Sequence, residues 1–313
     1  MRIFDSGNGR WPLVMILVGL MSGLTGSVSW AECTRMVHTF CGLEGPGALQ
    51  VRQGYALVYN HERLVPHWVA YQITPDFLRT PTRAGRFASF LVDPTIESPV
   101  RDRHYTGVEG RWGYVRGHLA PYKVMGGDRD GDGQYADLDP YVSDPDEELT
   151  IRQANQMSNI APQHDDEFNG PGGLWGKLER WIQDDVVEDE EKTVWVVAGT
   201  IFGPGATEQV VNPRLEPTVV HLQVPPMFFK VVIEDGFTEQ ESRVLAFLFP
   251  HQHVSHGDIT DFLVSIDVIE GMTGLDFFRD LPVEIETAIE RTDTCTYWNA
   301  YYDSWWNPFS GCR

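Results

Sequence analysis

Five short runs rich in valine and aromatic residues constrain the fold more than any other feature of the chain. They are ALVYN (56–60), HWVAYQIT (67–74), TVWVVAGTIFG (193–203), MFFKVVIED (227–235) and RVLAFLFP (243–250). Several of them alternate and are bounded by Gly, Pro or Asn, which is typical of strands. Helical patterns do not separate them in strict alternation. The order therefore predicts an antiparallel or mixed sheet and not a doubly wound one.

Two segments have the spacing of amphipathic helices. In 173–186 and in 258–274 apolar side chains fall on one face, namely Leu174, Leu178, Trp181 and Ile182 in the first and Phe262, Ile266 and Ile269 in the second. Asp258 is the expected N-cap of the second helix and Gly271 its expected end. Because the 313 residues contain no internal repeat and no long linker, residues 32–313 are expected to form a single domain.

The first 31 residues have a different character. Arg2 and Arg10 precede the apolar run WPLVMILVGLMSGLTG, and the small residues Ser29 and Ala31 follow it. This pattern predicts a signal peptide over 1–31, cleaved before Glu32, and hence a secreted or periplasmic protein with no stable membrane association. The alternative is an uncleaved anchor, but the run is shorter than the roughly 20 residues of a membrane span.

The four cysteines form two local pairs at opposite ends of the mature chain. For an exported protein an even number of cysteines favours disulfides. Pairing within each local pair would join Cys33 to Cys41 and Cys295 to Cys312, although three connectivities remain open.

The chain is strongly acidic, with a formal net charge of −21. Nucleic-acid-binding proteins usually carry a basic surface, so a polyanionic substrate would have to meet a local basic patch. Residues 128–148 contain nine Asp and Glu against one Arg. A second acidic run, 184–191, is interpreted as a solvated loop after a helix.

Part of the first acidic run has the spacing of a calcium loop. Asp128, Asp130 and Asp132 occupy positions 1, 3 and 5 of an EF-hand-like loop, and Gly133 is the sharp-turn glycine. Gln134 would offer its backbone carbonyl, Asp139 would close the loop, and Asp137 is an extra candidate ligand. No helix is evident on either side. The hypothesis is a Ca²⁺-binding insertion within 128–148, and the alternative is a solvated acidic loop.

Three residues could form a hydrolytic site. His118 lies in the glycine-containing bend VRGHLAP after a predicted strand, and histidine is the usual general base near neutral pH. Asn169 stands before the first predicted helix and Glu179 lies inside it, a pair that could hold a hydrated Mg²⁺. Taken one at a time, each has a structural alternative: a core histidine, a helix cap and a surface charge.

Taken together, these segments resemble the DNA/RNA non-specific endonuclease family, the ββα-metal nucleases. The similarity rests on HWVAYQIT, RGHLAP, SNIAPQ followed by FN and W-x-x-L-E, and VVAGTIFG, VPPMFFKVVI and SIDVIEGMTGLDFF in the same order. The resemblance implies an α+β fold with a central, mainly antiparallel sheet flanked by helices. It also implies a phosphodiester hydrolase with DNA and RNA as substrates. The sequence leaves the oligomeric state open, with a homodimer as one option.

The resemblance assigns roles residue by residue. His118 would be the general base, Asn169 the direct ligand of a single Mg²⁺ or Mn²⁺, and Glu179 would hold metal-bound water. Asn159 is the rival ligand, disfavoured because the family's ligand opens the helix that carries the Leu-Glu pair. An upstream arginine would grip the phosphate.

For that phosphate contact, the spacing to Phe90 and to Asp93-Pro94 favours Arg86 over Arg83. Arg116 is interpreted as a structural or substrate-flanking residue of the catalytic turn.

Three departures from the family pattern bear on activity. Val115 replaces the Asp that heads the catalytic motif, Gln183 replaces an Arg one turn beyond the Glu, and Asn169 and Glu179 are two residues further apart than in the Serratia nuclease. The alternative function is therefore a catalytically weakened calcium-binding module that binds nucleic acid. A short histidine cluster, His251, His253 and His256, is interpreted as a polar loop and not a metal site.

Overall fold

The computed structural model describes residues 38–139, 141–142, 144–206, 208–215, 219–234, 244–251 and 257–291. The predicted signal peptide, Cys33, Cys295, Cys312, His253 and His256 lie outside these ranges. Cys41 is fully buried and disulfide-bonded, and which cysteines pair with one another remains a prediction. In the described part of the chain, no helix is long and apolar enough to cross a membrane.

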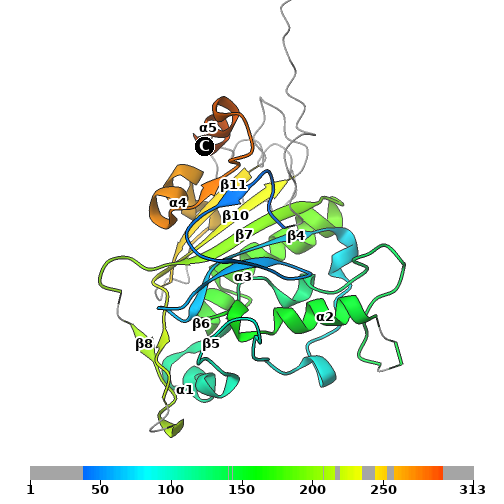
Figure 1. Cartoon of the computed structure of the whole chain (residues 1–313), viewed down its shortest axis with the longest axis vertical. Helices are drawn as coiled ribbons and strands as arrows, with labels where there is room; N and C mark the ends of the chain where they lie inside the picture. The colour runs from blue at the N-terminus through cyan, green and yellow to red at the C-terminus, as the bar shows by residue number, and fades with distance from the viewer. Residues whose placement is uncertain are drawn as a thin grey trace, which may run out of the picture. The chain divides into compact units, whose positions relative to one another are not determined.

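A seven-stranded antiparallel sheet forms the centre of the domain (Figure 1). Its strands, in spatial order, are β12 (Leu263–Val264), β11 (Val244–Pro250), β10 (Met227–Glu234), β7 (Val194–Ile201), β4 (Val65–Ile73), β3 (Ala56–Asn60) and β2 (Leu49–Val51). Every neighbouring pair in this sheet runs antiparallel. The five predicted strand segments are thereby confirmed, and the central sheet is antiparallel as expected.

Valine and aromatic residues suit these strands because β4, β7 and β10 are central and covered on both faces. All eight residues of β7 are buried. Seven of the nine residues of β4 are buried as well. Burial on both faces explains why the runs are nearly continuous in apolar residues and do not alternate strictly.

Among the described residues, three two-stranded pairs and five α-helices accompany the central sheet. The pairs are β1 (Leu43–Glu44) with β13 (Asp276–Phe277), β5 (Tyr114–His118) with β6 (Ile160–His164), and β8 (Gln209–Val210) with β9 (Leu222–Gln223). The helices are α1 (Val108–Trp112), α2 (Pro145–Ala154), α3 (Leu174–Arg180), α4 (Ile266–Thr273) and α5 (Val283–Arg291). α4 packs against α5 and also contacts β11 and β13.

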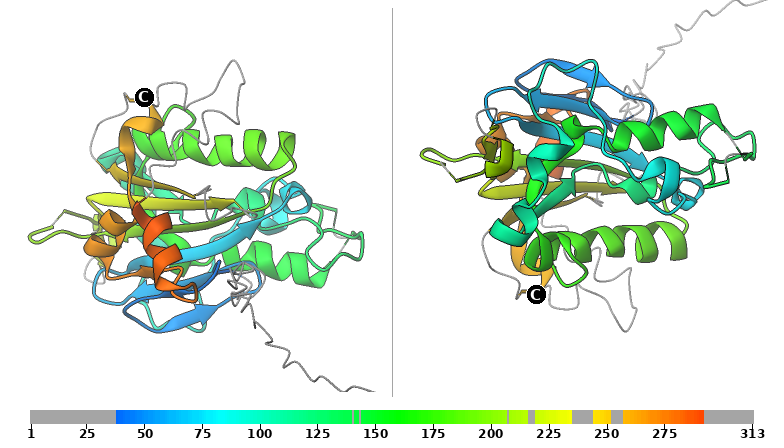
Figure 2. Two further views of the ribbon diagram at one scale, coloured as in Figure 1. Left: turned by 90° about the horizontal axis from the view of Figure 1, so that it is seen from above. Right: turned by 90° about the horizontal axis from the view of Figure 1, so that it is seen from below.

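The first predicted helix is present and packs on the sheet. α3 continues directly into a π-helical segment, η8 (Trp181–Asp189), and the two form one long lime-green helix alongside the sheet in Figure 2. Its apolar face joins the main core through fully or almost fully buried side chains, namely Leu174, Trp175, Leu178, Trp181 and Ile182. Burying each such side chain contributes about 1.5–3 kcal/mol.

The second predicted helix begins later than its sequence pattern suggests. Asp258 caps a short 3₁₀ turn, Ile259–Phe262, which is followed by strand β12. The α-helix starts only at Ile266, and it ends at Thr273, with the left-handed Gly274 as its C-cap, and not at Gly271. The expected N-cap and end of the α-helix were therefore wrong. The residues between the 3₁₀ turn and the α-helix form the edge strand β12 of the sheet.

A helix also follows the acidic run, where none was expected. α2 begins at Pro145, and its first turn carries Asp146, Glu147 and Glu148. Proline at the first position and acidic residues in the first turn both favour a helix start, because the N-terminus carries partial positive charge. The acidic insertion thus ends inside a helix.

The β5–β6 pair positions the catalytic turn, and its packing requires glycine at 117. A Cβ atom at Gly117 would lie 2.0 Å from Oε1 and 2.3 Å from Cγ of Gln163, whose side chain is fully buried. The neighbouring cross-strand pair Val115–Gln163 fixes this register. Glycine at 117 therefore leaves room for the glutamine side chain.

We expect Gly117→Ala to lower the free energy of unfolding by about 1–3 kcal/mol, because the added methyl overpacks a buried site. Urea unfolding would measure the loss. Gly110→Ala is the matched control, since no atom lies within 4 Å of its Cβ position. Adding Gln163→Ala to Gly117→Ala should recover part of the loss, and the absence of any recovery would contradict the steric explanation.

Candidate active site

His118 is the last residue of β5, and its ring lies between two aromatic side chains. The ring centroid is 5.4 Å from that of Phe90 and 6.5 Å from that of Tyr122. Its Nε2 atom is 3.2 Å from Oδ1 of Asn155. Asn155 follows the last residue of α2 and is almost completely buried.

The second hydrogen bond of Asn155 determines which histidine nitrogen is free. Its Nδ2 donates to the carbonyl of Phe87 at 3.0 Å, so Oδ1 is the atom that faces His118. An acceptor at that place requires the proton on Nε2 of the neutral ring. Nδ1 of His118 is then left with a lone pair that can accept a proton.

Burial lowers the pKa of His118 to about 4, the hydrogen bond to Asn155 raises it, and the positive charge of Arg83 lowers it. A neutral imidazole is the form that can act as a base. Above a pH of about 4 the ring is therefore in its reactive form.

Asn169 ends a short π-helical segment, η7 (Asp165–Asn169), directly before the glycine-rich turn. Its neighbour Phe168 is buried and stacks on Trp175 with ring centroids 5.6 Å apart. A Cβ atom at Gly176 would lie 2.6 Å from the Asn169 carbonyl oxygen, so only glycine lets α3 approach this closely. No hydrogen bond to another described residue engages the Asn169 side-chain amide.

Glu179 is held by a lysine from the central sheet. Nζ of Lys230 donates to its Oε1 at 3.0 Å, and the lysine side chain is completely buried. The same ammonium lies 3.7 Å from the Trp175 ring centroid, in cation–π range. Burial lowers the pKa of Lys230, and Glu179 raises it. Lys230 had no role in the sequence interpretation, because it lies inside an apolar strand.

His118, Asn169 and Glu179 line one cavity of about 370 Å³. Three residues of η5 (Tyr122–Val124) and the α3 region add polar groups to its wall, namely Lys123, Arg180 and Gln183. Lys123 and Arg180 were not singled out from the sequence. They supply the local positive charge that the acidic composition made necessary.

Asn159, the rival ligand, uses both polar atoms of its side chain in hydrogen bonds to the backbone. Its Oδ1 accepts from the Ala120 amide, and its Nδ2 donates to the carbonyls of Ala120 and Ala154, each at 2.9 Å. Its side chain is fully buried. This network holds the turn after His118 against the end of α2.

Arg116 has the structural position expected of it. Its Nε is 2.6 Å from Oδ1 of Asp102, and its guanidinium lies over the rings of Tyr105 and Phe90. The arginine charge is therefore largely neutralised beside the site.

The two candidate phosphate-binding arginines point to different places. Arg86 contacts Glu148 at 2.5 Å and the carbonyls of Asp137 and Val142 at 2.5 Å and 3.0 Å. Those partners belong to the acidic insertion and to α2. Arg83 instead lies 4.6 Å from the centroid of Phe90, the ring next to His118.

Two of the residues that depart from the family pattern, Val115 and Gln183, lie close to the site. Val115 offers no hydrogen bond to its cross-strand neighbour Gln163, and both polar atoms of the buried Gln163 side chain lack a partner among the described residues. Gln183 is almost completely buried at the wall of the cavity.

His251 is buried and not part of a polar loop, contrary to the sequence interpretation. Its Nε2 accepts from the His164 amide and its Nδ1 donates to the Pro225 carbonyl, each at 2.8 Å. The ring thereby ties the end of β6 to the segment before β10.

The predicted calcium residues fall into two groups. Asp128, Asp130 and Asp132 come together, with carboxylate oxygens within 4.8 Å of one another. Asp137 and Asp139 turn away and accept the backbone amides of Asp139 and Tyr141, each at 2.9 Å.

Gln134 lies beside the first group, with its side chain donating to Asp132 at 2.5 Å. Glu147, from the first turn of α2, lies close to Asp130, and burial raises its pKa to about 7.

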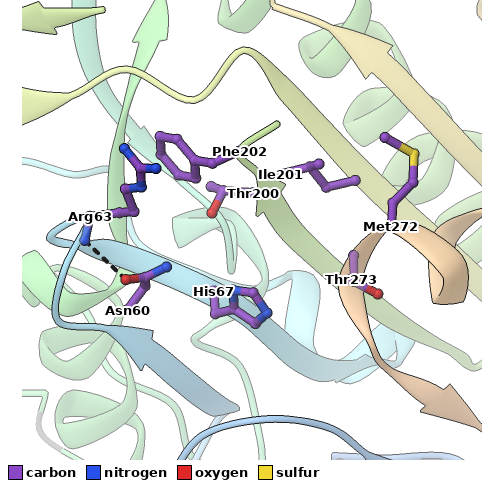
Figure 3. Close-up of a pocket in the computed structure, with 8 residues that line it drawn as sticks. All are labelled: Asn60, Arg63, His67, Thr200, Ile201, Phe202, Met272 and Thr273. Carbon is purple, nitrogen blue, oxygen red and sulfur yellow. Dashed lines mark hydrogen bonds between the residues drawn. The ribbon is translucent and has the colours of Figure 1, made fainter. Parts of the chain in front are cut away.

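A second, smaller cavity of about 160 Å³ opens where β4 and β7 meet α4 (Figure 3). Its wall includes His67, Thr200 and Thr273. Among the described residues that line it there is no carboxylate, so it has no counterpart of Glu179. The geometry assigns no reaction to this cavity.

The donors of the larger cavity fit a hydrated Mg²⁺. Asn169 brings an amide oxygen that accepts no hydrogen bond from another described residue, and Glu179 brings a carboxylate whose Oε1 is already oriented by Lys230. Magnesium prefers oxygen ligands, keeps most of its waters, and needs few protein ligands. One neutral and one anionic oxygen beside a neutral histidine match that requirement.

Comparison with known proteins identifies the family of this chain. The family model described as DNA/RNA non-specific endonuclease matches residues 40–284. The mitochondrial nuclease of Saccharomyces cerevisiae is 28% identical, over 81% of this chain and 73% of its own. A nuclease of Serratia marcescens is 26% identical, over 77% of this chain and 78% of its own.

A solved structure of EndoG with its inhibitor EndoGI superposes with a TM-score of 0.56 at 21% identity, over 77% of this chain and 90% of that one. That neighbour supports the α+β fold with its ββα arrangement of β5, β6 and α3. Since the family model spans most of the sequence and its relatives are nucleases, this chain is a nuclease of the DNA/RNA non-specific endonuclease family.

Proposed function

We propose that this nuclease is an exported, Mg²⁺-dependent endonuclease that hydrolyses both DNA and RNA. The observation that carries the proposal is the convergence of His118, Asn169 and Glu179 on one cavity from three separate elements. A free base nitrogen and two oxygen donors facing the same space are the minimum required for metal-assisted hydrolysis of a phosphodiester.

His118 acts as the general base. Asn155 holds the proton on Nε2, so Nδ1 withdraws a proton from the water that attacks phosphorus. The low pKa of His118 keeps the ring unprotonated between catalytic cycles. Contacts with the rings of Phe90 and Tyr122 restrict the rotation of the imidazole and hold that nitrogen in place.

Asn169 is the direct metal ligand in this proposal, and Glu179 binds water molecules of the hydrated ion. Mg²⁺ bound there would stabilise the negative charge that develops on the phosphate and on the leaving 3′ oxygen. Lys230 donates a hydrogen bond to Oε1 of Glu179 and so fixes its rotamer. The ion pair with Lys230 thus orients the Glu179 carboxylate, which lines the cavity.

The substrate backbone is met by positive charge at the rim. Lys123 and Arg180 line the cavity, and Arg83 stacks beside His118 on Phe90. A guanidinium in that position can contact two phosphate oxygens. We assign the phosphate contact to Arg83 in place of Arg86, whose hydrogen bonds are directed to the acidic insertion.

Export is the part of the proposal that rests on residues 1–31 alone. A basic start, an apolar run and small residues before Glu32 support a cleaved signal peptide. N-terminal sequencing of the mature protein from a secreting host would identify the cleavage site.

Purified protein in Mg²⁺ should convert supercoiled plasmid to fragments and should degrade RNA. His118→Ala should lower kcat by about 10²–10⁴, the usual contribution of a general base. His61→Ala is the matched control, because His61 is exposed and bonds only the Glu97 carbonyl among the described residues. No cleavage by the wild type would refute the enzyme proposal, and equal cleavage by His118→Ala would refute the base assignment.

Arg83→Ala should lower kcat/KM by about 10–100-fold, the equivalent of one charge-assisted hydrogen bond, mostly through KM. Arg86→Ala should leave kcat/KM within about 3-fold while lowering Tm, because its partners are structural. Steady-state kinetics on a defined oligonucleotide and thermal melting measure the two quantities. A loss of kcat/KM at unchanged Tm for Arg86→Ala alone would return the assignment to Arg86.

The pH profile should reflect the lowered pKa of His118. Protonation removes the base, so kcat/KM is expected to hold from neutral pH down to about 5 and then to fall, with a midpoint near a pH of about 4. An ordinary histidine would give a midpoint near 6.5. Circular dichroism at each pH is the control for unfolding. A midpoint at 6 or above with the fold intact would show that the ring is solvated.

A further inference from the structure

We propose that a single Ca²⁺ ion binds between the acidic insertion and the first turn of α2, held by Asp128, Asp130, Asp132, Asp146 and Glu147. This ligand set differs from the one that the linear loop pattern predicts, because the helix replaces Asp137 and Asp139. The site is separate from the Mg²⁺ cavity at His118.

Two groups of carboxylates meet at one residue. Asp128, Asp130 and Asp132 form one group, and Asp130, Asp146 and Glu147 form the other, with oxygens in each group within 4.8 Å of one another. Asp130 belongs to both. The two groups therefore adjoin at Asp130, one on the loop and the other at the start of α2.

Glu147 is the observation that points to a cation. Its side chain is completely buried at the base of this region. Oε1 accepts the backbone amide of Arg129 at 2.9 Å, while the buried Oε2 has no hydrogen-bond partner among the described residues. A buried carboxylate oxygen without a partner destabilises the fold, and a metal ion would satisfy it.

The charged residues around Glu147 do not supply a hydrogen bond to its Oε2. Arg129 lies nearby, but its guanidinium donates to the carbonyl of Val124 and lies over the ring of Phe77. Asp144 and Asp146 add further negative charge beside Glu147. Without a bound cation, the carboxylates of the proposed site would repel one another in a partly buried space.

Calcium fits this site better than magnesium does. Ca²⁺ accepts six to eight oxygen ligands in flexible geometry, whereas Mg²⁺ requires a regular octahedron and retains its waters. Five carboxylates can supply that number of oxygens, because some can bind through both atoms. Gly131 and Gly133, both at a φ of +82°, let the loop fold tightly around such a centre.

The position of the site links it to catalysis. Glu147 and Asp146 lie in the first turn of α2, and Asn155, which contacts Nε2 of His118, directly follows the last turn. Arg86 ties the same helix to the insertion through Glu148 and the Asp137 carbonyl. A cation that fixes the start of α2 therefore also fixes the residue that orients the base.

Isothermal titration of Ca²⁺ into the purified protein, in buffer with excess Mg²⁺, tests the proposal directly. The wild type should bind Ca²⁺, and Glu147→Gln and Asp130→Asn should each lose affinity at this site by at least 10-fold. Asp139→Asn is the matched control, since it removes a carboxylate of the same insertion outside the two groups. Glu290→Gln is a second control for the other acidic group, Asp267, Glu270 and Glu290.

Thermal melting supplies an independent readout. Without Ca²⁺, Glu147→Gln should melt at or above the wild-type Tm, because it removes a buried charge. With Ca²⁺ the wild-type Tm should rise and that of Glu147→Gln should not. Retention of tight binding by both Glu147→Gln and Asp130→Asn, loss in Asp139→Asn, or no Ca²⁺ binding by the wild type would overturn the proposal.

These measurements do not depend on cleavage of nucleic acid. Failure of the plasmid assay would leave the calcium result standing, and failure to bind Ca²⁺ would leave the nuclease proposal standing. Exposed Asp130 provides the variant least able to disturb folding.

Discussion

The buried ammonium of Lys230 is the constraint on which the geometry of the site depends. A positive charge in the core of a central strand must be neutralised, and a buried ion pair is retained only when its geometry is good. Glu179 supplies the partner, and Trp175 supplies the face of its ring. These contacts fix the rotation of α3 on the sheet. The same rotation sets Gly176 against Asn169 and leaves Glu179 facing His118 across the cavity.

A second set of contacts fixes the base from the opposite side. Asn155 and Asn159, four residues apart after α2, make hydrogen bonds to His118, to Phe87 and to the turn at Ala120. Buried amides that use all their hydrogen-bonding atoms are rigid, because any rotation leaves a polar atom unpaired. The histidine is therefore oriented by residues that follow α2, whereas Glu179 is oriented by Lys230 of the central sheet. The two sets of contacts meet at the cavity.

The sequence predicted the central strands, the helix on the sheet and the trio His118, Asn169 and Glu179, because their motifs are local and follow a known order. It did not single out Lys230 or Lys123, and it placed Arg83 second to Arg86 for the phosphate contact. Lys230 lies in a run that is otherwise apolar, and its partner is 51 residues away. Spacing favoured Arg86 over Arg83, and spacing does not reveal which way a guanidinium points. The start of α2 had a readable signal, Pro145 followed by three acidic residues, which the calcium-loop pattern obscured.

The basic rim of the cavity has a further consequence for a molecule with a net charge of −21. At long range a nucleic acid would meet a repulsive field, and in the proposed function it would meet Lys123, Arg180 and Arg83 at close range. Repulsion from the whole surface extends over a Debye length, roughly 10 Å at 0.1 M salt, while contacts at the rim are shorter than that. Moderate ionic strength should therefore screen the long-range repulsion between protein and nucleic acid more than it weakens the short contacts between the rim residues and phosphate. The rate of association with substrate should therefore tolerate moderate salt. A basic nuclease differs, because it associates fastest in dilute buffer.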